Sequence, residues 1–198
     1  MNYLAHAYLS FDNPDILTGN MINDYVKGKK KFDYPPNIQK GMELHRAIDH
    51  FTDIHPVTAS AKKIFSPEYR LYSGAFIDIV YDHFLALDKA QFEEYGGLQP
   101  FSEKIYQLLD NDQLYFPAPF QRMFPYMRQQ NWLYHYQFNE GIKNAFGGLV
   151  RRAKYLDESA IGFRIFEDHY LELQNFYAEF FPELKDFSIN KFRQLTEQ

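Results

Sequence analysis

The stretch GMELHRAIDHFTD, residues 41–53, decides the fold class of this chain. Leu44, Ile48 and Phe51 recur there at three- and four-residue steps, which return to the same side of an α-helix. Similar helical spacing, rather than the alternation that is typical of a strand, runs through most of the sequence. We therefore predict an all-α protein in which a helix covers residues 36–54.

Prolines and glycines indicate where the other helices begin and end. Proline is well tolerated in the first turn of a helix, and most of the ten prolines stand at such a position. Asn13 and Pro14 predict the start of a helix that runs to about Lys27, where Gly28 stops it. Turns are predicted at residues 66–67 and 94–97, and further helices at residues 74–87, 101–109, 119–130, 139–155 and 157–181.

The composition indicates one compact unit. The chain has 198 residues, of which 45% are hydrophobic, and this is enough to bury one sizeable core. No repeat, low-complexity tract or long linker interrupts it. We predict a single helical-bundle domain over residues 1–198.

Several classes of protein are disfavoured by composition. The absence of cysteine excludes disulfides, thiolate metal sites and a cysteine nucleophile, which agrees with a cytoplasmic location. No apolar run approaches the roughly 20 residues of a membrane span, and no basic leader suggests a signal peptide. The net charge of −5 disfavours general nucleic-acid binding, which usually needs a basic surface.

The predicted helix over residues 36–54 carries side chains that suit a divalent metal ion. His45 and Asp49 are four residues apart, so their side chains are neighbours on the helix surface. An imidazole and a carboxylate at this spacing can hold one divalent ion. Asp53 extends the row, and Arg46 lies beside it, where it could meet a phosphate oxygen. The competing interpretation is a solvent-exposed helix with surface ion pairs.

Acids and histidines also interrupt the apolar faces of other predicted helices. Asp24 shares a face with apolar residues, where an unpaired charge costs on the order of several kcal/mol, so a salt bridge or a metal is expected. Asp82 stands beside His83, which lies within an inward stripe; a hydrogen-bonded core histidine is the alternative. Helical bundles build metal sites from inward acids and imidazoles on facing helices. The predicted ligand set is His6, Asp24, His45, Asp49, Asp82 and His83.

The remaining four histidines are less suited to such a site. His50 and His55 lie near the end of their predicted helix, where they favour its negative pole. His135 lies among aromatic residues and is expected to pack or to form hydrogen bonds. His169 is far along the chain from the other candidates, and its approach in space stays open.

These residues also carry a resemblance to a known family. MNYLAHAYLS (1–10), LTGNMINDYVKG (17–28), GMELHRAIDHFTDIHP (41–56) and DIVYDHFLA (78–86) resemble, in order and spacing, the successive signatures of acyl carrier protein phosphodiesterases. The match covers about the first 90 residues. A later segment, residues 131–133, resembles its family equivalent more loosely.

The resemblance implies a helical fold distantly related to the HD phosphohydrolases. It also implies hydrolysis of the phosphodiester that joins phosphopantetheine to a serine of acyl carrier protein, with Mn²⁺ or Mg²⁺ as the metal. The order Asp82–His83 reverses the doublet that names the HD proteins, so their ligand geometry does not transfer directly. The residues expected to carry the chemistry are Asp24, His45, Arg46 and Asp49.

A short basic segment suggests how an acidic carrier would be bound. Lys27, Lys29, Lys30 and Lys31 directly follow the segment that carries Asp24, and positive charge there would steer an acidic partner. An ordinary solvated loop is the alternative. Two other functions stay open: an HD-like hydrolase of a small phosphoester or nucleotide, and a non-catalytic helical module that binds a protein. The sequence leaves the oligomeric state open.

Overall fold

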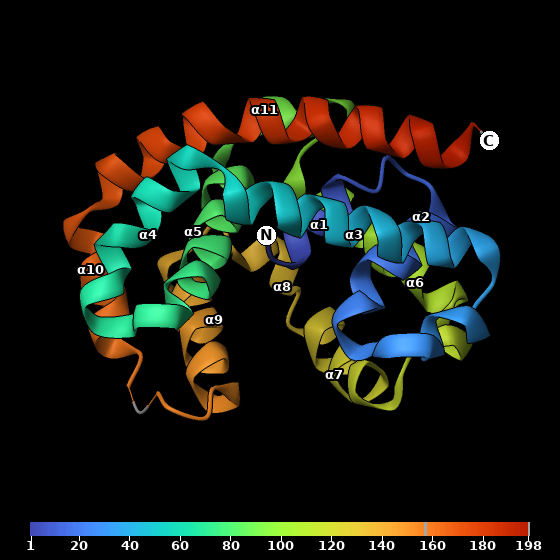
Figure 1. The fold of residues 1–198 in the computed structure, drawn as a ribbon, viewed down its shortest axis with the longest axis horizontal. Helices are drawn as coiled ribbons and strands as arrows, with labels where there is room; N and C mark the ends of the chain where they lie inside the picture. The colour runs from blue at the N-terminus through green and yellow to red at the C-terminus, as the bar shows by residue number, and fades with distance from the viewer. Residues whose placement is uncertain (157, 198) are drawn as a thin grey trace.

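The computed structural model describes residues 1–156 and 158–197, and every regular element in these ranges is a helix (Figure 1). The α-helices are α1 (Tyr3–Tyr8), α2 (Pro14–Ile22), α3 (Pro36–Ile54), α4 (Pro56–Tyr69), α5 (Ser73–Leu87), α6 (Leu98–Asn111), α7 (Ala118–Gln129), α8 (Trp132–His135), α9 (Asn139–Arg152), α10 (Ala160–Asp168) and α11 (Tyr170–Thr196). Five 3₁₀-helices connect them: η1 (Asn23–Tyr25), η2 (Gly28–Asp33), η3 (Arg70–Tyr72), η4 (Lys89–Tyr95) and η5 (Gln113–Tyr115). The predicted all-α class is confirmed.

The second helix is shorter than predicted. The Asn13 side chain accepts a hydrogen bond from the Ile16 amide and caps α2, which begins at Pro14 as expected. The helix ends at Ile22, however, and the backbone tightens into η1. This change rotates Asp24 out of the apolar stripe, so its side chain is 69% exposed. The prediction that Asp24 faces the core was wrong.

Two other boundaries differ from the prediction. Pro67 was expected in a turn but lies within the last turn of α4, a helix that the sequence analysis missed. The predicted helix over residues 157–181 begins at Asp157, which is outside the described residues. Beyond it the structure has α10 and α11, separated by His169. The break changes the direction of the chain while both helices keep apolar faces, so residue spacing alone does not show it (Figure 1).

The arrangement of α1, α2 and α3 positions the residues of interest. α2 packs very closely on α3 at Gly19 and Gly41: a Cβ on Gly19 would lie 2.0 Å from the Ile38 carbonyl oxygen. α1 lies near the centre of the molecule and packs on both α2 and α5. The long helix α11 crosses one side of the molecule and packs on α3, α4 and α5 (Figure 1).

In the described ranges, we find no helix that combines the length and the apolar character needed to cross a membrane.

Candidate metal centre

Three ligand-type side chains meet where α1 crosses α3. His6 comes from α1, and His45 and Asp49 come from one face of α3. One potential ligand atom from each lies within 4.8 Å of the others. The two imidazole rings stack with their centroids 3.9 Å apart and their planes 8° apart, and both histidines are buried. Helical packing thus joins two residues that are 39 positions apart in the sequence.

Asn20 orients both rings. Its side-chain oxygen lies 2.7 Å from Nδ1 of His6, and its backbone oxygen lies 2.7 Å from Nδ1 of His45. The side-chain NH₂ of Asn20 donates to the His6 carbonyl oxygen and to Ser10 Oγ. The side-chain oxygen is therefore the atom that faces the His6 ring. Because an amide oxygen can only accept, each Nδ1 carries a proton, and each Nε2 is directed toward the carboxylates.

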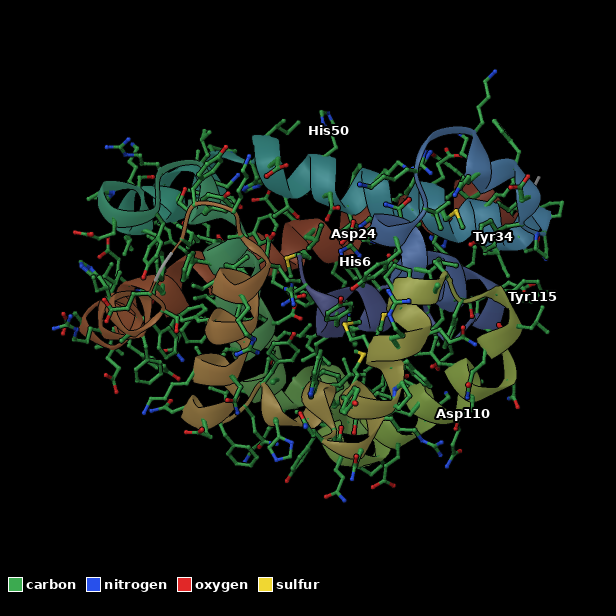
Figure 2. The ribbon with its side chains drawn as sticks, turned by 90° about the horizontal axis from the view of Figure 1, so that it is seen from below. His6, Asp24, Tyr34, His50, Asp110 and Tyr115 are labelled. Carbon is green, nitrogen blue, oxygen red and sulfur yellow. The ribbon has the colours of Figure 1, made fainter. Side chains whose placement is uncertain are left out.

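Two acids face the Nε2 atoms. Nε2 of His45 lies 2.9 Å from Asp49 and 3.1 Å from Asp24. Nε2 of His6 lies 3.3 Å from Asp49, but this contact lacks hydrogen-bond geometry, so that buried nitrogen has no hydrogen-bond partner within residues 1–156 and 158–197. The α-ammonium of Met1 lies 3.4 Å from Asp49. Figure 2 shows His6 and Asp24 in this central region.

The electrostatic environment shifts the pKa values of the two histidines in opposite directions. Burial and the neighbouring His45 lower the pKa of His6 to about 4, although Asp49 opposes this shift. Burial would also lower the pKa of His45, but hydrogen bonds to Asp24 and Asp49 and their charges outweigh it and raise this pKa to about 9. Hydrogen bonding to His45 lowers the pKa of Asp24. At Asp49, the contacts with His45 and His6 outweigh the effect of burial and also lower the pKa. Both acids are therefore ionised at neutral pH.

The donor set fits a divalent cation. Two imidazole nitrogens and carboxylate oxygens are ligands that first-row divalent ions accept. Histidines that bind metals usually donate their other ring N–H to a carbonyl or carboxylate, which is what Asn20 provides for both rings. A cation would also satisfy Nε2 of His6, the buried nitrogen that lacks a hydrogen-bond partner in the described part of the chain. Asp24 lies at the exposed side of this group.

The structure does not bring Asp82 and His83 into this group. The Asp82 carboxylate accepts hydrogen bonds from the backbone amides of Asn2, Leu4 and Ala5, at 3.4, 2.7 and 3.2 Å, and so caps the start of α1. His83 bonds through Nδ1 to the Tyr136 carbonyl oxygen at 2.7 Å. Its Nε2 bonds to the Tyr170 hydroxyl at 3.0 Å. Their inclusion in the ligand set is corrected: both are inward-facing, as predicted, but they meet other partners.

The remaining predicted residues lie on the surface near Asp24. Arg46 donates from Nε to the Asn23 side chain at 3.0 Å, one residue from Asp24. Arg46 and Lys31 line the same surface cavity of about 440 Å³, with Lys40 between them in sequence. Of the four predicted lysines, Lys27 precedes η2, whereas Lys29, Lys30 and Lys31 lie within it.

One important residue was missed by the sequence analysis. Asn20 is a fully buried amide that neither an acid nor a histidine pattern selects. It was nevertheless present in the quoted segment LTGNMINDYVKG, which includes both Asn20 and Asp24. The signal that could have identified Asn20 is its spacing, because it lies four residues before Asp24 within a mostly apolar segment.

The fold and the site define a helical protein with a His–His–Asp centre that suits a divalent ion. A family model described as acyl carrier protein phosphodiesterase matches residues 1–184. A relative of that name from Photorhabdus laumondii is 30% identical over 191 residues, which cover 96% of each chain. Relatives of the same name from Yersinia pestis and Escherichia coli O157:H7 are 32% and 29% identical, over 93% of this chain and 95% of theirs.

The chain therefore belongs to the acyl carrier protein phosphodiesterase family. No solved structure matches it significantly, so the distant relation to the HD phosphohydrolases stays a prediction.

Proposed function

We propose that this protein is a metal-dependent phosphodiesterase that removes 4′-phosphopantetheine from the serine of holo-acyl carrier protein. Family membership supports the carrier as substrate. One observation supports the metal: Asn20 holds Nδ1 of both His6 and His45, so both Nε2 atoms face Asp49. Mn²⁺ and Mg²⁺ are the ions we expect, with His6, His45 and Asp49 as ligands and Asp24 at the open side.

The proposed reaction is attack of water on phosphorus. The bond from phosphorus to the serine oxygen breaks, and the serine oxygen takes up a proton, which leaves apo-carrier and 4′-phosphopantetheine. A divalent ion, when bound, supplies Lewis acidity toward the phosphoryl group and the attacking water. The residue best placed to accept the proton of this water is Asp24, because it is exposed and lies 3.1 Å from His45. The contact with His45 lowers the pKa of Asp24 and keeps it ionised, although it also makes the carboxylate a weaker base.

Arg46 is proposed to stabilise the negative charge that develops on the phosphoryl oxygens. Its side chain is held near Asp24 by the bond to Asn23, and a guanidinium is well suited to phosphate oxygens. Acyl carrier proteins are strongly acidic, and the surface cavity that includes Lys31, Lys40 and Arg46 offers them positive charge beside the reaction centre. The segment with Lys27, Lys29 and Lys30 extends this basic surface.

The direct test is to incubate the protein with holo-acyl carrier protein and Mn²⁺ and to follow the mass of the carrier. The expected result is loss of the phosphopantetheine mass. His45→Ala and Asp24→Ala should lower the rate by at least about 100-fold. His50→Ala is the matched control, because His50 lies on the same helix but points outward (Figure 2), and its rate should be unchanged.

Other results would contradict the proposal. If the carrier keeps its mass while small phosphoesters are cleaved, the site is hydrolytic but the carrier is not its substrate. If the carrier loses its phosphopantetheine equally well with His45→Ala, the assignment of the site is wrong.

A further inference from the structure

A second cavity, of about 580 Å³, lies along α8 and α9 and shares no lining residue with the surface cavity of Lys31, Lys40 and Arg46. Cavities of roughly 300–1,000 Å³ are typical of small-molecule sites. Asn2 and Tyr3 form part of its wall, together with Trp132 of α8 and residues from Glu140 to Arg152 along α9. Neither the proposed reaction nor the surface cavity of Lys31, Lys40 and Arg46 accounts for this second cavity.

The cavity adjoins the metal centre through α1. Tyr3 lines the cavity, and His6 follows it by one turn of the same helix. The Tyr3 hydroxyl lies 2.7 Å from the Tyr25 hydroxyl, and Tyr25 is the neighbour of Asp24 in the chain. Tyr3 therefore joins the wall of the cavity to the segment that carries Asp24. A ligand whose phosphate reached Asp24 could place its other end in the cavity.

The walls combine amides, aromatic rings and guanidinium groups. Asn2 and Asn144 offer both hydrogen-bond donors and acceptors, whereas Trp132 offers an aromatic face. Arg151 and Arg152 add donors that suit carbonyl oxygens. This mixture does not suit a purely apolar chain, and Glu140 on the same wall offsets part of the positive charge of the two arginines. It suits a linear, uncharged molecule with amide bonds and short aliphatic segments.

We infer that this cavity binds the pantetheine arm of the carrier, an inference that rests on the proposed function. Pantetheine is a linear chain with two amides, a hydroxyl group, a dimethyl-substituted carbon and a terminal thiol. Its amides match Asn144 and the two arginines, and its dimethyl group matches the Trp132 ring. The metal centre then acts on the phosphate end of the arm, while the cavity along α9 selects the arm itself.

Trp132 allows the inference to be tested without any reaction. It is the single tryptophan of the chain, so its emission reports on the cavity alone. Pantetheine without its phosphate is titrated into the metal-free protein, and a saturable change in tryptophan emission is expected, with a Kd on the order of 1 mM. Hexane-1,6-diol, a linear uncharged molecule without amide bonds, should produce no saturable change.

Two neighbouring glycines of α9 supply a matched pair of variants. Gly148 lines the cavity, and a Cβ there would meet only the flexible guanidinium groups, 3.5 and 3.7 Å away. Gly148→Leu should therefore occupy the cavity and abolish the emission change. Gly147 lies outside the lining, and its Cβ would meet Arg151 at 3.4 Å and Ser159 at 3.9 Å, both ordinary contact distances. Gly147→Ala adds only this Cβ and leaves Arg151 in place, so it should bind pantetheine as the unmodified protein does.

The same pair is then compared with holo-carrier as substrate. Gly148→Leu should raise KM at least about tenfold, whereas Gly147→Ala should stay within about twofold. Thermal unfolding verifies that each variant folds, and Asn144→Leu replaces Gly148→Leu if that variant is unfolded.

Failures of the two proposals can be told apart. If pantetheine causes no saturable change, or if Gly148→Leu and Asn144→Leu bind it normally, the cavity inference is overturned even though the carrier is hydrolysed. If pantetheine binds and Gly148→Leu prevents it, the cavity inference stands even though the carrier keeps its phosphopantetheine.

Discussion

Asn20 holds the candidate metal centre together although it carries no charge. It fixes the rotation of both imidazoles through one side-chain oxygen and one backbone oxygen. Asn20→Ala removes the bond to His6 and leaves that ring free to turn. We expect metal affinity to fall about 10- to 100-fold, as measured by Mn²⁺ titration, because such outer contacts commonly contribute this much. Asn37→Ala, at an exposed amide bonded to Asp15, should leave the affinity unchanged.

For the proposed metal, His45 is expected to link binding to pH. Its pKa of about 9 lies above its ordinary value of 6.5, so the protonated ring stabilises the metal-free fold below pH 6.5, and this contribution disappears as pH rises through 9. A metal must displace that proton. Calorimetric titration at pH 7.5, in buffers of different ionisation enthalpy, should show release of about one proton, and affinity should rise about tenfold per pH unit. If protons are taken up on metal binding, or if no proton is exchanged, the predicted role of His45 is wrong.

At the residue scale, the sequence predicted which side chains face inward better than which partners they meet. His6, His45 and Asp49 were predicted and do come together, since two of them share one helical face. Asp82 and His83 also face inward, but Asp82 caps α1 and His83 bonds to α8 and α11 neighbours. Helical spacing defines a face, whereas the packing of other helices decides what covers it.

At the scale of elements, two glycines bring Asn20 to His45. A Cβ on Gly41 would lie 2.3 Å from the Ile16 carbonyl oxygen and 2.9 Å from Gly19, so α2 and α3 would have to separate. Gly41→Ala should lower the free energy of unfolding by about 3 kcal/mol and weaken metal binding. Gly74→Ala meets only the flexible end of Lys62 and should change stability by less than about 1 kcal/mol. Chemical denaturation measures both.

The role of His83 is to join α5 to Tyr136, just after α8, and to Tyr170 at the start of α11. Its two ring nitrogens bond to Tyr136 and Tyr170, so His83→Leu leaves a buried carbonyl without its donor. The free energy of unfolding should fall by about 1–3 kcal/mol in urea denaturation, whereas Mn²⁺ affinity should be unchanged. If the His83→Leu protein is fully folded but binds Mn²⁺ much more weakly, His83 is a metal ligand after all.

At the scale of the whole molecule, charge is concentrated where the partner is proposed to bind. The net charge is −5, yet Lys29, Lys30 and Lys31 form a local basic segment that continues toward Arg46. Replacing these three lysines with Glu should weaken binding of acyl carrier protein in a salt-sensitive way, because exposed charges are screened by ions. Surface plasmon resonance at several salt concentrations measures this. Unchanged affinity at low salt would eliminate the basic segment as a docking surface.

Most of the architecture was accessible from the sequence. The helix at α3 was predicted with its observed ends, because a proline opens it and its apolar spacing is regular. The break at His169 and the early end of α2 were not predicted. Both depend on local backbone geometry that leaves the apolar spacing intact. The cavity along α9 depends on how three segments meet, and no local pattern describes that.

The helix α11 has a mechanical consequence. Its 27 residues extend for about 40 Å at the usual rise per residue. Along this length it touches α3, α4 and α5, with Phe180 against Tyr81 and Lys191 paired with Glu43. Packing on one continuous partner couples the local unfolding of these helices. Destabilising either end of α11 is therefore expected to increase the motion of α3, the helix that carries His45.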